Sequence, residues 1–171
     1  GLTAVPLCHK TSKEILVHSI SSAGLEMLVV DERGQSQFEV ISSALHHEPR
    51  ILKVPGTQGQ GLTWAEVQVE GAPPSIDLHA KDESKILFTS GSSGLPKGVV
   101  QTHQNIVANV QSVWDVISLA QDFRFFKSAP DYHSMGILNI YFPLAKGWTL
   151  DLARSPDRVL SDIRHSAPQG F

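Results

Sequence analysis

The chain has 171 residues, 41% of them hydrophobic, and a net charge of −3 from 14 Lys+Arg and 17 Asp+Glu. This composition excludes a disordered or membrane-like chain. No basic tract predicts a nucleic-acid partner, and no apolar stretch approaches the roughly 20 residues that a membrane-spanning helix needs.

Helical and strand patterns alternate through residues 1–56. Thr11-Ser12-Lys13-Glu14 is a capping box, which predicts a helix that begins there and ends at Gly24. Apolar runs at 25–30 and 50–54 have the length of strands, and apolar residues at helical spacing between them predict a second helix before Pro49. This alternation predicts an α/β fold with a mostly parallel sheet covered by helices.

The pattern loosens over 57–83, where glycine and proline predict a connecting region with a short element around Trp64 to Val67. A second α/β segment is expected over 84–171. Its predicted elements are strands at 85–89, 98–102, 124–128 and 148–152, and helices at 104–119, 135–144 and after Ser155-Pro156. The chain is thus expected to contain two α/β subdomain segments, 1–56 and 84–171, joined by a loop region.

The stretch from Phe88 to Gly98 carries the clearest chemical signal. It combines hydroxyls, glycines and one lysine in a turn after a strand: Thr89, Ser90, Gly91, Ser92, Ser93, Gly94 and Lys97. Glycines let backbone amides approach an anion closely, and a lysine is a mobile positive charge for phosphate. These residues favour a phosphate-type ligand over the alternative, a Gly/Ser turn that binds nothing.

The spacing does not fit other phosphate loops. Counted from Gly91, Lys97 occupies the lysine position of a Walker loop, but Pro96 replaces the second glycine and Gly98 replaces the magnesium-binding Ser/Thr. The residues after Lys97 predict a strand rather than a helix. Ser93 also breaks the dinucleotide fingerprint, so we expect a loop between two strands.

Residues 86–100, followed by Thr102-His103, closely resemble the signature of the adenylate-forming superfamily. That superfamily includes acyl-CoA synthetases, peptide-synthetase adenylation domains and luciferases. Residues 1–7 and 130–136 also resemble parts of these proteins, so the resemblance covers essentially the whole chain. It implies part of the N-terminal domain of an adenylate-forming enzyme, with both subdomain segments belonging to one incomplete domain.

The resemblance implies that Thr89, Ser90, Gly91, Ser92, Ser93, Gly94 and Lys97 hold the β and γ phosphates of ATP. It implies attack of a substrate carboxylate on the α-phosphorus, which gives acyl-AMP and pyrophosphate. The acyl group then passes to a thiol, either of coenzyme A or of a carrier protein's phosphopantetheine arm. By the same resemblance, Mg²⁺ accompanies the ATP, and its protein ligand is expected outside this chain.

Two histidines lie at positions that match the family. His133 corresponds to a position beside the acyl pocket and thiol tunnel, although the residues alone favour a histidine that caps the helix beginning near Ser134. His103 is expected to cap the following helix rather than to touch ATP. His46 and His47 are adjacent and do not share a helix face, so no metal site is expected.

The family's adenine-recognising motif, ribose-binding aspartate, hinge and C-terminal catalytic lysine are not found before Phe171. We therefore expect the chain to be inactive alone and to need the remainder of a parent ligase. The alternative is a stand-alone, non-catalytic remnant that binds a nucleotide or a partner. The identity of the carboxylic acid and of the thiol acceptor stay open.

Cys8 is the single cysteine, which excludes an internal disulfide. Together with the lack of a charged-then-apolar leader, this predicts an intracellular, cytoplasmic protein.

Overall fold

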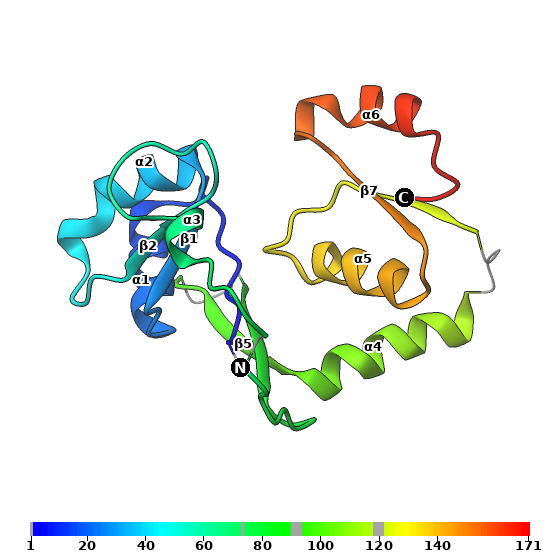
Figure 1. Cartoon of the computed structure of the whole chain (residues 1–171), viewed down its shortest axis with the longest axis horizontal. Coiled ribbons are helices and arrows are strands. Elements are labelled where there is room, and N and C mark those ends of the chain that lie inside the picture. Colours follow the sequence, from blue (N-terminus) through cyan, green and yellow to red (C-terminus); the bar gives the residue numbers. More distant parts are fainter. Residues whose placement is uncertain (1, 73, 90–93, 118–121) are drawn as a thin grey trace. The chain divides into compact units, whose positions relative to one another are not determined.

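The computed structural model describes residues 2–72, 74–89, 94–117 and 122–171. It has the predicted α/β architecture, in which parallel strands alternate with helices (Figure 1). The described residues form two compact units. The first unit contains Leu7–Asp77 and Phe88–Val99, and the second contains Leu2–Pro6, Leu78–Leu87 and Val100–Phe171. The division predicted at residues 56 and 84 remains a prediction.

The first unit is built on a three-stranded sheet in the order β1-β2-β3. Its elements are α1 (Lys13–Ser22), β1 (Met27–Val30), α2 (Glu32–Ile41), η1 (Ser42–Ala44), β2 (Arg50–Lys53), β3 (Leu62–Thr63) and α3 (Trp64–Val67). All pairings in this sheet are parallel, with Met27 opposite Arg50 and Leu52 opposite Leu62. Leu28 of β1 packs against both buried clusters of this unit, so the strand joins α1 and α2 into one core.

Two helix boundaries differ from the predicted ones. The cap of α1 is Ser12 rather than Thr11: Ser12 has the extended backbone of a cap, and its side chain accepts a hydrogen bond from the amide of Ile15. The second helix ends at Ile41 and continues as the 3₁₀ turn η1, because the chain tightens before it leaves for β2.

A two-stranded sheet contains β4 (Glu83–Thr89) and β5 (Lys97–Thr102), and α4 (His103–Val116) follows directly. Thr102 caps α4, since its side chain accepts a hydrogen bond from the amide of Asn105 at 3.2 Å. The predicted capping role of His103 is therefore wrong, because His103 is already the first helical residue. Within this helix, Val110 is buried and Ile106 and Val113 are half-buried.

The second unit also contains a parallel pair of strands with a helix between them in sequence. Its elements are β6 (Arg124–Lys127), α5 (Ser134–Ala145), β7 (Thr149–Leu152), η2 (Pro156–Arg158) and α6 (Val159–Ser166). Aromatic rings pack together in the core of this unit. The centroid of the Trp148 ring lies 4.7 Å from that of the Phe123 ring and 5.2 Å from that of the Phe142 ring. No helix within the described ranges is long and apolar enough to cross a membrane.

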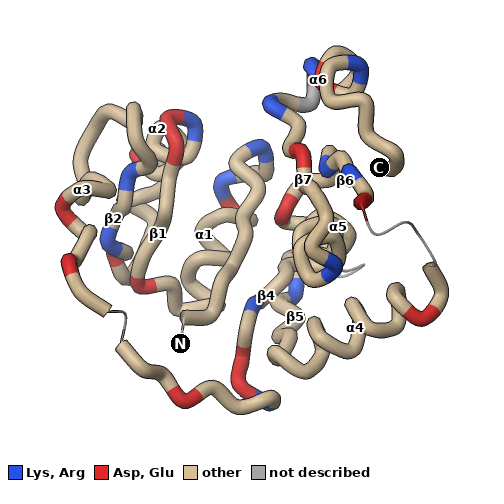
Figure 2. The backbone as a smooth tube through the Cα atoms, turned by 45° about the vertical axis from the view of Figure 1, so that its right-hand side comes forward, with Lys and Arg blue, Asp and Glu red and all other residues tan. Residues whose placement is uncertain are grey.

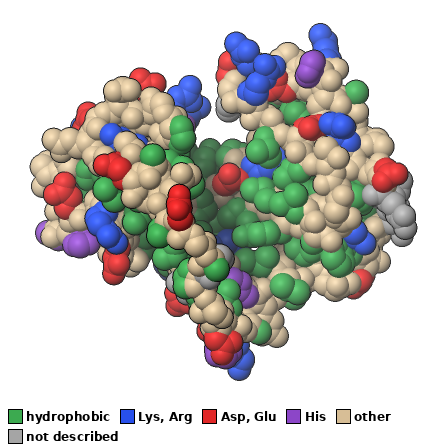
Figure 3. All heavy atoms as spheres, in the orientation of Figure 1, with side chains coloured by type: hydrophobic (Ala, Val, Ile, Leu, Met, Phe, Trp, Pro, Cys, Tyr) green, Lys and Arg blue, Asp and Glu red, His purple; other side chains and the backbone are tan. Residues whose placement is uncertain are grey.

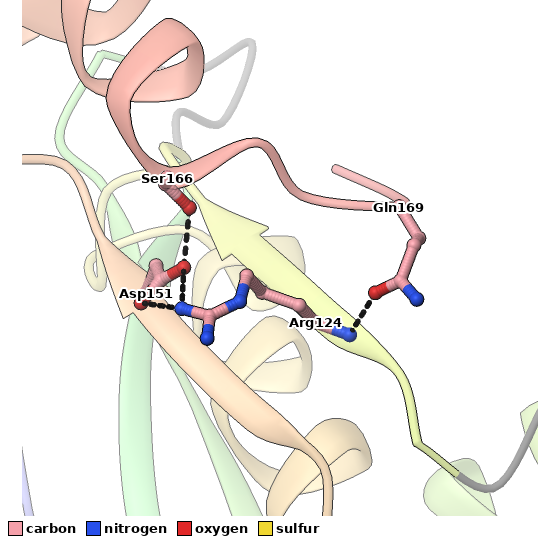
Figure 4. A network of polar contacts seen from close by, with 4 residues as sticks. All are labelled: Arg124, Asp151, Ser166 and Gln169. Carbon is pink, nitrogen blue, oxygen red and sulfur yellow. Dashed lines mark hydrogen bonds and ion pairs between the residues drawn. The ribbon is translucent and has the colours of Figure 1, made fainter.

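Two ion pairs fix β7 to its neighbours. Arg124 of β6 contacts Asp151 of β7 at 3.1 Å, Ser166 of α6 donates to the same carboxylate, and Gln169 accepts from the amide of Arg124 (Figure 4). After β7, the side chain of Asp162 accepts from the backbone amide of Arg154 at 2.9 Å and from its Nε at 2.7 Å. These contacts hold α6 against the end of the strand pair.

Both carboxylates make the second unit sensitive to acid. Hydrogen bonds from Ser166 and Arg124 lower the pKa of Asp151, and those from Arg154 lower the pKa of Asp162. A lowered folded-state pKa stabilises the fold above the unfolded-state value of about 3.9, and this stabilisation is lost as the pH falls through the folded-state pKa.

We therefore expect the urea concentration at the unfolding midpoint to fall as the pH is lowered below about 4. Asp162→Asn is expected to lower this midpoint at neutral pH and to make it depend less on pH in the acid range, called here the acid limb. Urea titrations of both proteins from neutral to acidic pH measure this. The matched control is Asp122→Asn, at an exposed position. An Asp162→Asn protein with the same acid limb as the original chain contradicts the assignment.

Candidate phosphate-binding loop

The two strands that flank the predicted phosphate loop lie side by side. Thr89 ends β4 and Lys97 begins β5, and the Thr89 hydroxyl donates to the Lys97 carbonyl at 3.4 Å. A strand, not a helix, follows the loop, as its spacing predicted. The structure thus brings together Thr89 and Lys97, the two predicted phosphate-binding residues at the ends of the loop. Ser90, Gly91, Ser92 and Ser93 lie outside the described residues.

Lys97 supplies an available positive charge at this place. Its side chain is exposed, and none of the described ion pairs involves it. Gly94 has a backbone φ of +104°, which residues with a side chain rarely adopt. Elsewhere in the molecule, lysine and arginine are interspersed with acidic residues (Figure 2).

The segment just before Lys97 is anchored to α1 by a histidine. Pro96 is buried, and its carbonyl contacts Nε2 of His18 at 2.9 Å, so this nitrogen carries the donating proton. The same half-buried ring meets the ring of Phe88 edge-on, with centroids 6.4 Å apart. His18 therefore contacts residues on both sides of the loop, and it fixes the backbone from which Lys97 projects.

No pattern in the sequence singles out His18. It lies in an amphipathic helix among apolar neighbours, where a histidine is ordinarily part of the packing. Its partner, Pro96, is 78 residues away, and no motif links the two positions.

We expect His18→Phe to lower the free energy of unfolding by about 1 kcal/mol, because the carbonyl of buried Pro96 loses its donor. His18→Gln, which keeps a donor, is expected to lose less. Urea denaturation of the chain measures both, and His47→Phe at an exposed position is the control. Equal stability of the Phe and original proteins would show that the hydrogen bond contributes nothing.

His133 belongs to the second unit. It occupies the cap position of α5 with an extended backbone, but its side chain makes no capping hydrogen bond. The exposed ring instead lies 4.6 Å from that of Tyr132. His133 is therefore the cap residue of α5, as the residues alone favoured, but its side chain takes no part in the capping. Its place beside an acyl pocket stays a prediction.

The chain matches the profile of the AMP-binding enzyme family over residues 1–171. It is 29% identical over 166 residues to a feruloyl-CoA synthase of Amycolatopsis sp., covering 95% of the chain and 31% of that protein. It is 35% identical over 119 residues to the L-proline--[L-prolyl-carrier protein] ligase of Pseudomonas fluorescens, covering 66% and 23%. Its fold matches the N-terminal domain of FACL13 from Mycobacterium tuberculosis with a TM-score of 0.78 at 20% identity, covering 98% of the chain and 42% of that domain.

The chain therefore belongs to the AMP-binding enzyme family, whose members form acyl adenylates. It corresponds to a portion of the N-terminal domain of acyl-CoA ligases, and the resemblance found in its sequence is confirmed. The chain spans about a third of the length of the feruloyl-CoA synthase, since 31% of that protein is covered.

Proposed function

We propose that this chain supplies the ATP phosphate-binding loop of a ligase that activates a carboxylic acid as acyl-AMP. The observation that carries the proposal is the loop itself: residues 86–100 bear the family signature, and β4 and β5 place Thr89 and Lys97 beside each other at its two ends. The acyl group then passes to the thiol of coenzyme A or of a carrier protein. The feruloyl-CoA synthase and the prolyl-carrier ligase represent these two kinds of acceptor by their names.

The chemistry of the loop fits a polyphosphate. ATP supplies the adenylyl group and a pyrophosphate leaving group. Thr89, Ser90, Ser92 and Ser93 offer hydroxyl donors, and Gly91 and Gly94 allow the backbone to approach the phosphates. The ammonium of Lys97 offsets the negative charge that grows on the departing pyrophosphate, and such electrostatic stabilisation usually accounts for the greatest share of an enzyme's rate enhancement.

The remaining partners follow from the same proposal. His133 lines the acyl or thiol pocket, and a magnesium ligand comes from outside this chain, as the resemblance to adenylate-forming enzymes implies. In the second unit, hydrophobic side chains gather over α5 (Figure 3), and Met135 and Leu144 are exposed on that helix. We expect the remainder of the parent polypeptide to cover them.

ATP–pyrophosphate exchange tests the proposal. The parent ligase, supplied with a panel of aryl, fatty, malonyl and amino acids, is expected to catalyse exchange with at least one of them. The 171-residue chain is expected to give no exchange under the same conditions. ATP–pyrophosphate exchange by the chain alone would contradict the proposal that it supplies only the phosphate-binding loop. A parent protein that binds ATP but catalyses exchange with none of the acids would favour a non-catalytic remnant.

A further inference from the structure

Two lysines of the second unit are buried, and their ammonium groups have different surroundings. Lys127 lies 2.7 Å from the carboxylate of Asp131 and donates to the carbonyl of Ala129 at 2.8 Å. Lys85 is buried more completely, with 6% of its surface exposed. None of the ion pairs found among the described residues involves its ammonium group.

Lys85 lines a small polar cavity. Its Nζ lies 5.4 Å from the centre of the Tyr141 ring, and both residues line a cavity of about 30 Å³. The other polar groups on its wall are side chains that can donate hydrogen bonds: Gln101, Asn105, Asn109 and Ser134. No acidic side chain of the described residues lines it.

One of these donors is already oriented. Oδ1 of Asn105 accepts from the amide of Thr102 at 3.0 Å and from its hydroxyl at 3.1 Å. The acceptor end of Asn105 is therefore engaged at the start of α4, which leaves its NH₂ end as the donor for other partners. A cavity lined by an ammonium, amides and hydroxyls presents positive and donating groups, which suit an anion.

The charge of Lys85 is not offset by its own strand. Glu83 lies two residues earlier on the same face of β4 and is exposed, and no ion pair between it and Lys85 is found among the described contacts. Burial accordingly lowers the pKa of Lys85, because the charged form loses its hydration. Contact with Tyr141 offsets only part of that loss, since Tyr141 is itself 41% exposed and a cation–π contact is weaker at an exposed site.

We infer that the cavity is a binding site for one compact monovalent anion, of the size of chloride or of a formate carboxylate. A cavity of about 30 Å³ accommodates about one water molecule, so a polyphosphate or a bulky organic anion does not fit. The inference is separate from the proposed function of the loop, because every wall residue belongs to the second unit.

The test is a titration of the Lys85 ammonium by ¹³Cε NMR in the whole chain at constant ionic strength. Chloride, formate and gluconate are compared, and Lys85→Met identifies the resonance by its absence. An anion that binds only the charged form raises the pKa of Lys85 by about 1 at ten times its dissociation constant. Gluconate is too large to enter and serves as the reference.

Lys146 is the matched control, because it also lies over an aromatic ring, that of Trp114 at 4.4 Å, but is exposed. We expect chloride, formate or both to raise the pKa of Lys85 and to leave that of Lys146 unchanged. A response to chloride alone would assign a halide site, and a response to formate a carboxylate site. Identical Lys85 titrations in all three salts, or equal shifts of both lysines, would overturn the inference.

Discussion

Replacing Lys97 by methionine in the parent ligase is expected to lower the rate of ATP–pyrophosphate exchange about 100-fold, since removing one preorganised donor to a developing charge costs roughly 100- to 1000-fold. The exposed side chain makes no ion pair with the described residues, so methionine leaves the packing intact. The kinetic constants for ATP and for the acid, measured by exchange, give the effect.

The control is Lys10→Met, at an exposed lysine of the same unit, which is expected to retain full exchange activity. The effect of Lys97→Met is expected in the turnover rate more than in the KM of the acid, because the charge it offsets develops on pyrophosphate. Exchange within two-fold of the original enzyme would show that Lys97 has no part in catalysis.

The largest effect on stability is expected from Gly136→Ala. A Cβ at Gly136, in the first turn of α5, would overlap the carbonyl oxygen of Pro130 and would lie 2.9 Å from that of Ala129. Both contacts are with backbone, so no side chain can move aside. We expect a loss of about 3 kcal/mol or more, because overpacking against a fixed backbone is strongly destabilising.

Thermal unfolding measures this loss, which corresponds to a fall in Tm of roughly 6–12 °C for a chain of this size. The substitution Met135→Ala, at the neighbouring position, is the control, since the Met135 side chain is exposed in the same helix. A Gly136→Ala protein that melts within 2 °C of the original, where roughly half a kcal/mol is lost, would show that the segment before α5 relaxes freely.

Much of the fold could be predicted because helical and strand patterns alternate with clear turn residues. The pattern located β2 and α5 closely, since Pro49 precedes the first and apolar residues fill the second. The predicted cap at Thr11 was wrong because two adjacent hydroxyls both satisfy the capping pattern, and it is the side chain of Ser12 that accepts the hydrogen bond from the amide of Ile15. His103 was misassigned similarly, one residue after the true cap, Thr102.

The candidate site could be predicted only where its chemistry is local in sequence. The phosphate loop is one continuous segment, so its glycines, hydroxyls and lysine were visible as a motif. His18 and Lys85 were not, because their importance depends on residues distant in the chain: Pro96 for the first, and Gln101 to Tyr141 for the second. Burial of a lysine in a strand has no sequence signature, since charged residues normally mark the exposed face.

The function proposed for this chain depends on the loop between β4 and β5 binding the phosphates of ATP. The decisive experiment is a titration of the ¹⁵N-labelled chain with magnesium pyrophosphate and with magnesium ATP, followed through backbone amide resonances. We expect the largest shifts to occur between Thr89 and Gly98 with both ligands, and Lys97→Met to abolish them. Shifts that are confined to other segments, or that persist unchanged in Lys97→Met, would contradict phosphate binding at this loop.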